Sequence, residues 1–490
     1  MAAIRPRRLS NLPTKASRLQ AMSSSVPPLL PHATRDLARF AAAIRFADLP
    51  AAVGDRVKLS FLDALGVCLH GSTLPWTERL RDVVLEDGGK PLASIWSTGT
   101  KVGLTGAVLV NSTAGHAFEM DDIHKESIIH PNSLSVPTAL ALAEADRTLT
   151  GQDIVAAIAI GAEIGIRIGN AATMALFLNG FHPQGTSGAF VAAVTAGHLL
   201  KLPAEQMQHA MGIAGSLGAG LMAAQEGAMV KRLHAGRAAQ GGMYAALLAR
   251  KGFTGISDVV EAGYGGFLSA HARTPNPARL LAGLGTDWEV AKVGFKMYPN
   301  VTSIHAALDA LRAALAEERL SAPDIESIEI GCGHMTFVHT AWDYRPAGVT
   351  AAQMNMFYGI AAMALRGDVS VGDYTEAAIA DPQILSFIPR IKVFVDDEIE
   401  GMGAAFRHAA RVSVHTTDGR TVTREVLNRR GSPENAVTRE DVERKFASNL
   451  ASLFKSGDIE RLKTLALTLD TLPNADDILR LIGPARARSA

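Results

Sequence analysis

The chain has 490 residues, 48% of them hydrophobic, so it can bury a large core and has the length of two or three domains or of one large helical domain. Its 48 lysines and arginines equal its 48 aspartates and glutamates, and no overall positive charge marks it for nucleic acid or an anionic membrane. Two cysteines, Cys68 and Cys332, exclude a disulfide framework and a CxxC zinc or redox pair, and they indicate a reducing compartment.

The first 33 residues differ in composition from the rest of the chain. Residues 1–25 carry five basic side chains with several serines, and no acidic residue occurs before Asp36. This composition is typical of an organellar presequence, while a disordered start-site extension with Met22 as the true start explains it equally well. We therefore expect a cytoplasmic or mitochondrial protein whose fold begins near Pro31.

Residues 34–294 predict a large all-helical domain. Thr150 begins a Thr-Gly-Gln-Asp sequence, which resembles a capping box and predicts that a helix starts at the apolar run behind it. Residues 188–200 and 211–224 are small and apolar on nearly all sides, which is typical of helices surrounded by protein. Small residues also allow neighbouring helices to approach closely.

The longest apolar stretch, residues 154–169, does not predict a membrane span. Glu163 and Arg167 interrupt it, and it is shorter than the roughly 18 uninterrupted apolar residues expected of a spanning helix. We expect a soluble protein that does not associate with a membrane.

The sequence pattern changes after Pro299. Residues 325–334, 390–397 and 410–427 alternate apolar and polar side chains and are rich in Val, Ile and Thr, and the last contains an Asp-Gly turn between two alternating arms. This pattern predicts strands in a small α+β domain. From about Thr438 the spacing of apolar residues is helical again.

The predicted fold class is therefore mainly α, a large all-helical domain with an inserted smaller α+β lid domain. The helical domain comprises residues 34–294 and 436–490, and the lid comprises residues 295–435. The cleft between the two domains is the expected ligand site.

The loop at residues 119–135 is polar in apolar surroundings. It carries four acids and two histidines, which are Glu119, Asp121, Asp122, Glu126, His124 and His130. With His116 they offer the ligand types of a carboxylate-rich metal site, but no HExxH pattern occurs and the spacing turns His124 away. We therefore predict no metal. A solvated surface loop is the alternative, which the buried-looking flanking helices disfavour because they hold the loop at a cleft.

Three further polar clusters interrupt apolar sequence. His182 precedes Thr186 and Ser187 ahead of a buried helix, and such a run can present backbone NH groups to an anion. The other two clusters consist of Lys231, Arg232, His234 and Arg237, and of Lys296, Tyr298 and His305. Each alone fits a structural or surface role, but together they predict proton transfer on an anionic substrate whose carboxylates pair with lysines. Nothing in this chemistry requires a nucleotide, flavin or pyridoxal cofactor.

Several ordered blocks resemble the MmgE/PrpD family, which includes 2-methylcitrate dehydratase and cis-aconitate decarboxylase. The blocks are EMDDIHKESIIHPNSLSVPTALALAE, GFHPQGTSGAFVAAVTAGHLLKL, MVKRLHAGRAAQGGMYAALLARKGFTG, EAGYGGFL and WDYRPAGVTAAQMNMFYGIA. The resemblance extends from about residue 35 to the C-terminus. It implies a helical domain completed by C-terminal helices, a smaller α+β lid and a homodimer.

The resemblance also implies site residues. The matching positions are His130, Asp121, Asp122, Glu119, His182, Lys231, His234, Lys296 and, as the weakest match, Tyr344. We expect Lys231 and Lys296 to supply positive charge, His130 to move a proton with His182 as its partner, and the aspartates to orient the rings. The segment TSIHAALDA lacks the cysteine pair that the family often has after the Tyr-Pro step, so the pocket wall there is expected to differ.

The expected activity is a lyase that needs no metal or cofactor and acts on a small di- or tricarboxylate. Decarboxylation of cis-aconitate to itaconate is the leading interpretation, because the opening loop resembles the decarboxylases more than the dehydratases. A hydro-lyase for 2-methylcitrate or an alkylcitrate and an epimerase acting beside a carboxylate, as on iminodisuccinate, use the same acid-base groups. A non-catalytic binding protein is a further alternative, against which the four matched polar positions argue.

Overall fold

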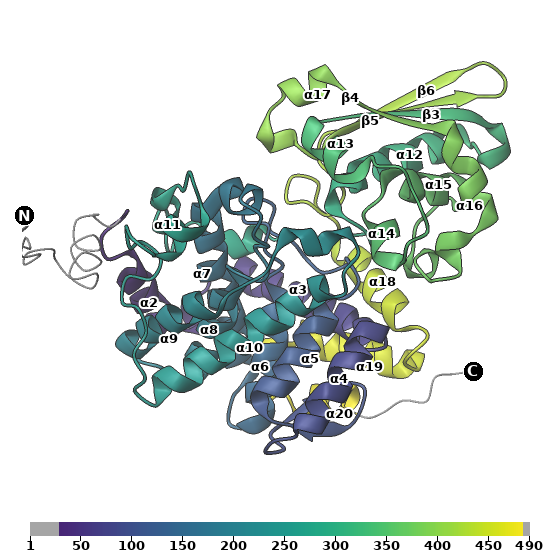
Figure 1. The fold of residues 1–490 in the computed structure, drawn as a ribbon. Helices are drawn as coiled ribbons and strands as arrows, with labels where there is room; N and C mark the ends of the chain where they lie inside the picture. The colour runs from purple at the N-terminus through teal and green to yellow at the C-terminus, as the bar shows by residue number, and fades with distance from the viewer. Residues whose placement is uncertain (1–28, 484–490) are drawn as a thin grey trace, which may run out of the picture.

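The computed structural model describes residues 29–483, and residues 1–28 of the expected presequence lie outside this range. Within it the protein is mainly α, which confirms the predicted fold class (Figure 1). Buried apolar side chains form two cores. One is built by residues 33–293 and 446–482, the helical unit, and the other mainly by residues 298–426, the α+β unit. The chain therefore leaves the first core, builds the second and returns.

Ten helices and a short hairpin precede the α+β unit in the described chain. They are α2 (Ala33–Ala43), α3 (Ala51–Gly71), α4 (Pro75–Asp87), β1 (Ala93–Ile95), β2 (Thr100–Val102), α5 (Leu104–Gly115), α6 (Asn132–Ala145), α7 (Gly151–Leu178), α8 (Gly188–Leu199), α9 (Ala204–Leu217), α10 (Val230–Arg250) and α11 (Phe267–His271). Helix α8 is central, because α7, α9 and α10 all pack against it.

Glycines allow this close packing. A Cβ atom added at Gly161 of α7 would lie 2.8 Å from the carbonyl oxygen of Val191 in α8. A Cβ atom added at Gly242 of α10 would lie 2.5 Å from the backbone nitrogen of Ala193. Both distances are too short for a real Cβ contact, so the expected role of small residues in helix approach is visible at these two positions.

Helix α7 begins as its sequence predicts, with Thr150 and Asp153 forming a reciprocal capping box. Its 28 residues are long and apolar enough to cross a membrane, which the interrupted apolar run did not indicate, but the apolar window is entirely buried inside the protein. Glu163 and Arg167 pair within the helix at 2.6 Å, so their charges are compensated internally. The helix is kinked at Thr173, which has a positive φ of 58°.

The α+β unit contains a four-stranded sheet in the order β4-β3-β5-β6, in which only β3 and β4 are parallel. Its elements are α12 (His305–Glu318), β3 (Ile325–Cys332), α13 (His334–Thr340), α14 (Val349–Gln353), α15 (Met356–Arg366), α16 (Pro382–Phe387), β4 (Ile391–Val395), α17 (Asp397–Gly401), β5 (Ala410–Thr416) and β6 (Thr421–Val426). Helix α12 packs on β5 and β6, and Figure 1 shows helices α12, α15 and α16 together on one side of the sheet. The expected Asp-Gly turn connects β5 and β6 at Asp418 and Gly419.

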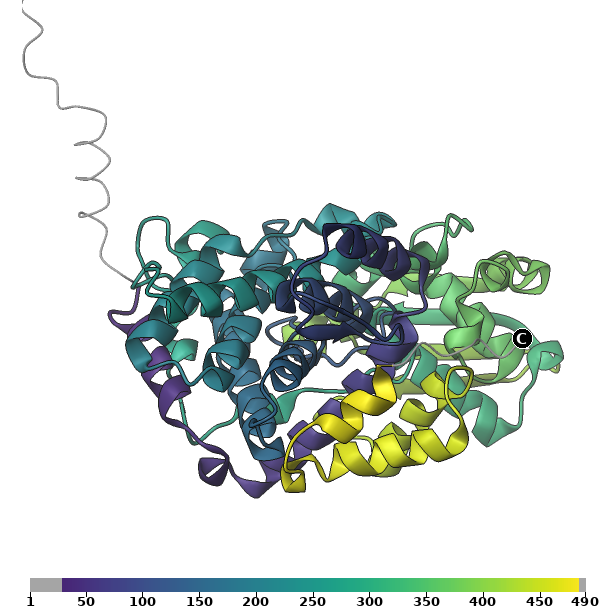
Figure 2. The same ribbon diagram turned by 90° about the horizontal axis from the view of Figure 1, so that it is seen from below.

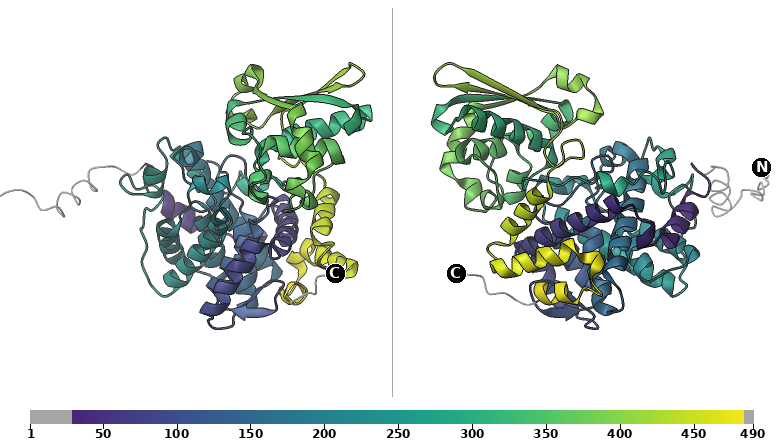
Figure 3. Two further views of the ribbon diagram at one scale, coloured as in Figure 1. Left: turned by 45° about the vertical axis from the view of Figure 1, so that its right-hand side comes forward. Right: turned by 180° about the vertical axis from the view of Figure 1, so that it is seen from behind.

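The last helices return to the helical unit. Helix α18 (Arg439–Leu450) begins at a capping box on Thr438, and α19 (Ser456–Leu467) and α20 (Asp476–Ile482) follow. Both α18 and α19 pack against α3, and Figures 2 and 3 show these C-terminal helices beside the N-terminal part of the chain. Segments separated by almost 400 residues in sequence therefore share one core.

Candidate active site

The loop between α5 and α6, residues 116–131, is mostly buried although it is rich in charged groups. Ile123 and Gly294 exchange backbone hydrogen bonds of 2.9 and 2.8 Å, which fix the loop to the segment that leads into the α+β unit. His124 lies 3.1 Å from a carboxylate oxygen of Glu289 and does not line the cavity described below. The loop is therefore part of the protein interior rather than a solvated surface.

Asp121 is shared by two histidines. Its Oδ2 atom lies 2.7 Å from His116 Nδ1 and 3.2 Å from His130 Nδ1. Burial would raise the pKa of Asp121, but the two histidines lower it well below its usual range. Burial lowers the pKa of His116 to about 3 against the attraction of Asp121, so this ring is neutral at neutral pH. With Nδ1 of His130 directed to the carboxylate, Nε2 is the nitrogen left for chemistry.

Glu119 binds three cations at once. Its carboxylate forms ion pairs with Lys231 and Arg232, and its second oxygen lies 3.1 Å from Lys296 Nζ. Burial would raise the pKa of Glu119, but these three cations lower it well below its usual range. Burial also lowers the pKa of Lys231 to about 8, although Glu119 opposes the shift. The cluster carries an excess of positive charge in a buried place.

A second histidine pair lies beside this cluster. The Nδ1 atoms of His182 and His234 are 2.9 Å apart, and the rings of His182 and His116 are 5.6 Å apart. Burial and the neighbouring charges of His116 and Lys231 lower the pKa of His182 well below its usual range, and burial lowers that of His234. At neutral pH both rings are neutral, so one Nδ1 donates to the other.

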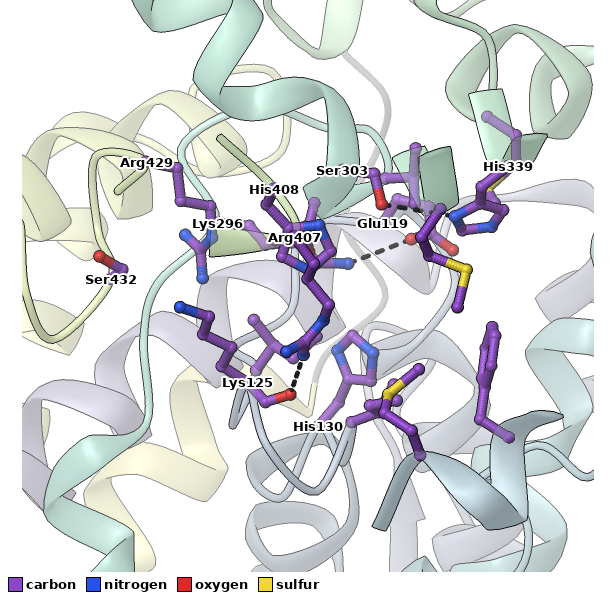
Figure 4. A pocket seen from close by; sticks show the side chains of 18 of the residues that line it. Glu119, Lys125, His130, Lys296, Ser303, His339, Arg407, His408, Arg429 and Ser432 are labelled. Carbon is purple, nitrogen blue, oxygen red and sulfur yellow. Dashed lines mark hydrogen bonds and ion pairs between the residues drawn. The ribbon is translucent and has the colours of Figure 1, made fainter. Parts of the chain in front are cut away.

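These groups border a cavity of about 110 Å³ that both units of the protein line (Figure 4). Its cationic side chains are Lys125, Lys231, Lys296, Arg407 and Arg429, and its histidines are His130, His182, His339 and His408. Among the lining residues of the described chain, Glu119 alone supplies a carboxylate. The cavity is suited to a small ligand with several negative charges.

The sequence matches two consecutive family models, the MmgE/PrpD N-terminal domain over residues 35–279 and the MmgE/PrpD C-terminal domain over residues 298–471. The chain belongs to the MmgE/PrpD family. The second model includes α18 and α19, which lie in the helical unit, so the boundary between the family models does not coincide with the boundary between the two cores.

Curated relatives extend over nearly the whole chain. The cis-aconitate decarboxylase-like protein oryM of Aspergillus oryzae is 29% identical over 471 residues, which are 92% of this chain and 97% of that protein. Cis-aconitate decarboxylase of Aspergillus terreus is 28% identical over 92% of this chain and 95% of its own length. The human cis-aconitate decarboxylase is 27% identical over 88% of this chain and 90% of its own length. This MmgE/PrpD protein is accordingly a lyase.

The structure brings most of the sequence-predicted site residues of this MmgE/PrpD protein together. His130, His182, Lys231 and Lys296 line one cavity although they come from four separate segments of the chain. Asp121 lies behind His130, at the position expected of a carboxylate that orients a ring. Their roles in catalysis remain predictions.

Other predicted residues lie differently from what we expected. Among residues 29–483 no hydrogen bond joins Asp122 to a histidine ring, and its carboxylate accepts hydrogen bonds from the backbone and side chain of Asn132, at the start of α6. Burial and the nearby charge of Asp121 raise the pKa of Asp122 well above its usual range. Glu119 lines the cavity, but it is an anion paired with three cations and so positions them instead of attracting a carboxylate.

Four predicted substrate contacts do not line the cavity. One is His234, which lies behind His182 with the two Nδ1 atoms 2.9 Å apart. The hydroxyl of Tyr344 donates to the carbonyl of Ile379 at 2.8 Å, and the Tyr344 ring stacks on Tyr358 inside the α+β unit. The hydroxyl of Thr186 donates to the carbonyl of His182 at 3.0 Å, and Ser187 is wholly buried at the start of α8. Thr186 supports the His182 backbone, whereas Tyr344 belongs to the second hydrophobic core.

Several groups of the site were missed by sequence reasoning. Gln353 of α14 donates 2.9 Å hydrogen bonds to the carbonyls of Phe118 and Pro299 and accepts one from Arg232, so it connects the two units. Cavity residues missed in the α+β unit and after it are Ser303, His339, Arg407, His408, Arg429 and Ser432. A usable signal was present for some of them, because Arg-His at 407–408 and Arg-Arg at 429–430 are basic pairs next to predicted strands.

His116, Asp121 and His130 could together offer three ligand atoms to a metal ion, all within 4.8 Å of one another. However, Nδ1 of His116 is already hydrogen-bonded to Asp121 Oδ2, and Nδ1 of His130 lies 3.2 Å from the same oxygen. Lys296 Nζ lies 3.8 Å from the other oxygen of Asp121, so its ammonium would repel a cation bound there. This donor set fits ring orientation better than metal binding.

The affinity of the free enzyme for a carboxylate should fall as the pH rises through about 8. The reason is that Lys231 binds an anion only while protonated, and burial lowers its pKa to about 8. The inhibition constant of tricarballylate, measured between about pH 6.5 and 9.5, should therefore rise above pH 8. Lys231→Arg keeps its charge throughout this range and should remove the rise. The same rise in the arginine variant would show that another group titrates.

Proposed function

We propose that this lyase releases carbon dioxide from cis-aconitate and forms itaconate, and that neither a metal nor an organic cofactor takes part. The supporting observation is the cavity in which five cations and four histidines surround one space that holds a single carboxylate. The relatives from Aspergillus terreus and human are named for this activity, which agrees with the charge of the site.

The proposed reaction breaks the bond between the CH2 carbon of cis-aconitate and its carboxylate, which leaves as carbon dioxide. The released electron pair forms the new double bond of itaconate, and the electrons of the old double bond move to the carbon beside a remaining carboxylate. That carbon then takes one proton. Negative charge grows on a fragment that is already anionic, so cations arranged in advance stabilise the transition state.

The residues have distinct parts in this proposal. Lys231 and Lys296 bind the carboxylate on which charge accumulates, while Glu119 holds them in place. Nε2 of a protonated His130 donates the proton at carbon, and Asp121 stabilises the imidazolium form by its contact with Nδ1. His182 is the second acid-base group, supported by His234.

A substrate with three carboxylates also uses the other cations that line the cavity. Figure 4 shows Lys125, Arg407 and Arg429 around the cavity beside Lys296. Arg429 is only 5% exposed, and its guanidinium donates to the carbonyl of Phe295 at 2.7 Å. Among residues 29–483 no ion pair joins it to a carboxylate. The remaining N–H groups of such a buried guanidinium can donate strong hydrogen bonds to a ligand carboxylate.

Replacing Arg429 by leucine should raise KM for cis-aconitate by roughly 10- to 100-fold, because a hydrogen bond to a charged group is worth about 1.5–3 kcal/mol. The effect on kcat should be much smaller, since Arg429 is proposed to bind a carboxylate that does not react. Steady-state kinetics of carbon dioxide release measures both constants. The control is Arg424→Leu. Arg424 lies on β6 and forms an exposed ion pair with Glu317 of α12, so its replacement should leave KM unchanged. An unchanged KM in Arg429→Leu would contradict this assignment.

The proposed function is tested by incubating the purified chain with cis-aconitate, 2-methylcitrate and iminodisuccinate, each with and without a chelator. Carbon dioxide and itaconate from cis-aconitate support the proposal. Loss of water from 2-methylcitrate alone would replace it by a hydro-lyase, and a change of optical rotation with iminodisuccinate alone by an epimerase. Turnover that the chelator abolishes would overturn the metal-independent mechanism.

We also propose a homodimer. Several large apolar side chains are exposed between the end of α9 and the middle turns of α10, and they are Leu217, Leu221, Met229, Val230 and Tyr244. An exposed apolar patch of this kind marks an interaction surface. Light scattering of the purified protein measures the oligomeric state. Movement of the α+β unit as a lid and a mitochondrial location remain predictions.

A further inference from the structure

The cavity has an apolar side that the proposed reaction does not use. Phe177, Met335 and Met354 line it, and the same three side chains also line a neighbouring space of about 460 Å³, here called the outer chamber. Val338 and Trp342 of the α+β unit complete the apolar wall of this chamber. The outer chamber opens toward solvent and has room for a group that the three carboxylates of cis-aconitate do not provide.

The polar groups of the outer chamber are already paired. Gln225 and His339 lie 3.1 Å apart, and His339 also faces the Ser303 hydroxyl at 3.4 Å. Burial lowers the pKa of His339 to about 4, so its ring is neutral at neutral pH. No cationic side chain of the described chain lines the chamber, so it offers nothing to a carboxylate.

The outer chamber lies away from the cations that would bind the distal carboxylate. Figure 4 shows His339, which belongs to both spaces, on the side of the cavity opposite Arg429 and Ser432. A ligand held by Arg429 therefore extends toward the end of the cavity at His339, where Met335 and Met354 line both spaces. Val338 is 63% exposed and Trp342 is 38% exposed, so apolar area remains there for a ligand to cover.

We propose that the site also accepts a tricarboxylate that carries an unbranched alkyl chain longer than methyl, and that this chain occupies the outer chamber. Methionine side chains are flexible and polarisable, which suits a site that receives a chain of variable conformation. The inference rests on the proposed function for the position of the carboxylates, and it extends the substrate class from cis-aconitate to its alkylated derivatives.

Binding of unreactive alkylsuccinates to the purified full chain tests the inference. Each added CH2 group should contribute about 0.8 kcal/mol, or roughly a fourfold decrease in Kd, until the chain reaches the end of the chamber. Calorimetry with succinate and its methyl, butyl and hexyl derivatives should show a roughly 60-fold decrease in Kd from methyl to butyl. A negative heat-capacity change that grows with chain length should accompany it.

Two variants locate the chain. Met335→Gln keeps the length of the side chain but places an amide in the apolar wall, so it should reduce the gain per CH2 to less than about twofold. Met402→Gln changes a methionine that lines neither space and should preserve the gain of the wild-type protein. If Kd still falls about fourfold per CH2 group in Met335→Gln, the alkyl chain binds elsewhere and the inference is wrong.

The binding test of the alkyl chain and the carbon dioxide assay of the proposed function can fail independently of each other. Release of carbon dioxide from cis-aconitate together with Kd values that are independent of chain length would leave the function standing and overturn the alkyl chain. A clear chain-length series without any carbon dioxide release would support the chamber and overturn the decarboxylation. If Trp342→Glu converts a dimer into monomers and the series is flat, the chamber is a subunit contact and the inference is wrong.

Discussion

Replacing His130 by glutamine should reduce kcat for carbon dioxide release by roughly a hundredfold to ten-thousandfold, the usual contribution of a positioned acid-base group. Glutamine retains a polar side chain of similar size but cannot deliver a proton. Because His130 lines the cavity and Asp121 orients its ring, the loss should appear mainly in kcat and only slightly in KM. Steady-state kinetics with product analysis measures both.

His124→Gln is the matched control for this prediction. His124 lies in the same loop and is as deeply buried, but it pairs with Glu289 and does not line the cavity. Its kcat should stay within about threefold of that of the wild-type enzyme. Near-normal turnover in His130→Gln, or an equal loss in both variants, would contradict the assigned role of His130.

Replacing Glu119 by glutamine should lower the free energy of unfolding by about 3–5 kcal/mol, the usual cost of removing one partner from a buried ion pair. The variant leaves Lys231, Arg232 and Lys296 buried without their anion. Urea denaturation followed by circular dichroism measures the change. Glu329→Gln, which removes an exposed pair with Lys392, is the control and should cost less than about 1 kcal/mol.

A ligand distinguishes this charge effect from general damage. A tricarboxylate such as tricarballylate returns negative charge to the cluster, so it should raise the thermal midpoint of Glu119→Gln more than that of the wild-type protein. An equal increase of the thermal midpoint in both proteins would mean that the bound anion does not interact with these three cations. A variant that unfolds at all ligand concentrations would instead indicate that the carboxylate is needed to shape the loop.

The fold was largely predictable because its signals are local. Thr150 and Thr438 start helices through contacts with residues three positions later, and the turn at Asp418 and Gly419 connects two alternating strands. Helical spacing and β-branched alternation also depend only on near neighbours in the chain. These features therefore identify helices and strands without knowledge of tertiary contacts.

The site was predictable only where a motif marked it. The family blocks indicated His130 and Lys231, the Tyr-Pro step indicated Lys296, and all three line the cavity. The contacts of Gln353 with Arg232 and of Arg429 with Phe295 span 121 and 134 residues, and no local spacing encodes such partners. For Tyr344 the motif was misleading. The WDYRP block resembles the family, but the Tyr344 ring packs against the second hydrophobic core and does not line the cavity.

The side chains that line the cavity come from both units of the protein, each with its own hydrophobic core. Neither unit alone supplies all of the cations. Loss of activity on heating should therefore follow the less stable core, even while the other remains folded. A carboxylate bound across the boundary favours the state in which both cores are intact. If the two cores melt in separate steps, saturating substrate should merge these steps into one, because the bound ligand couples the stability of one core to that of the other.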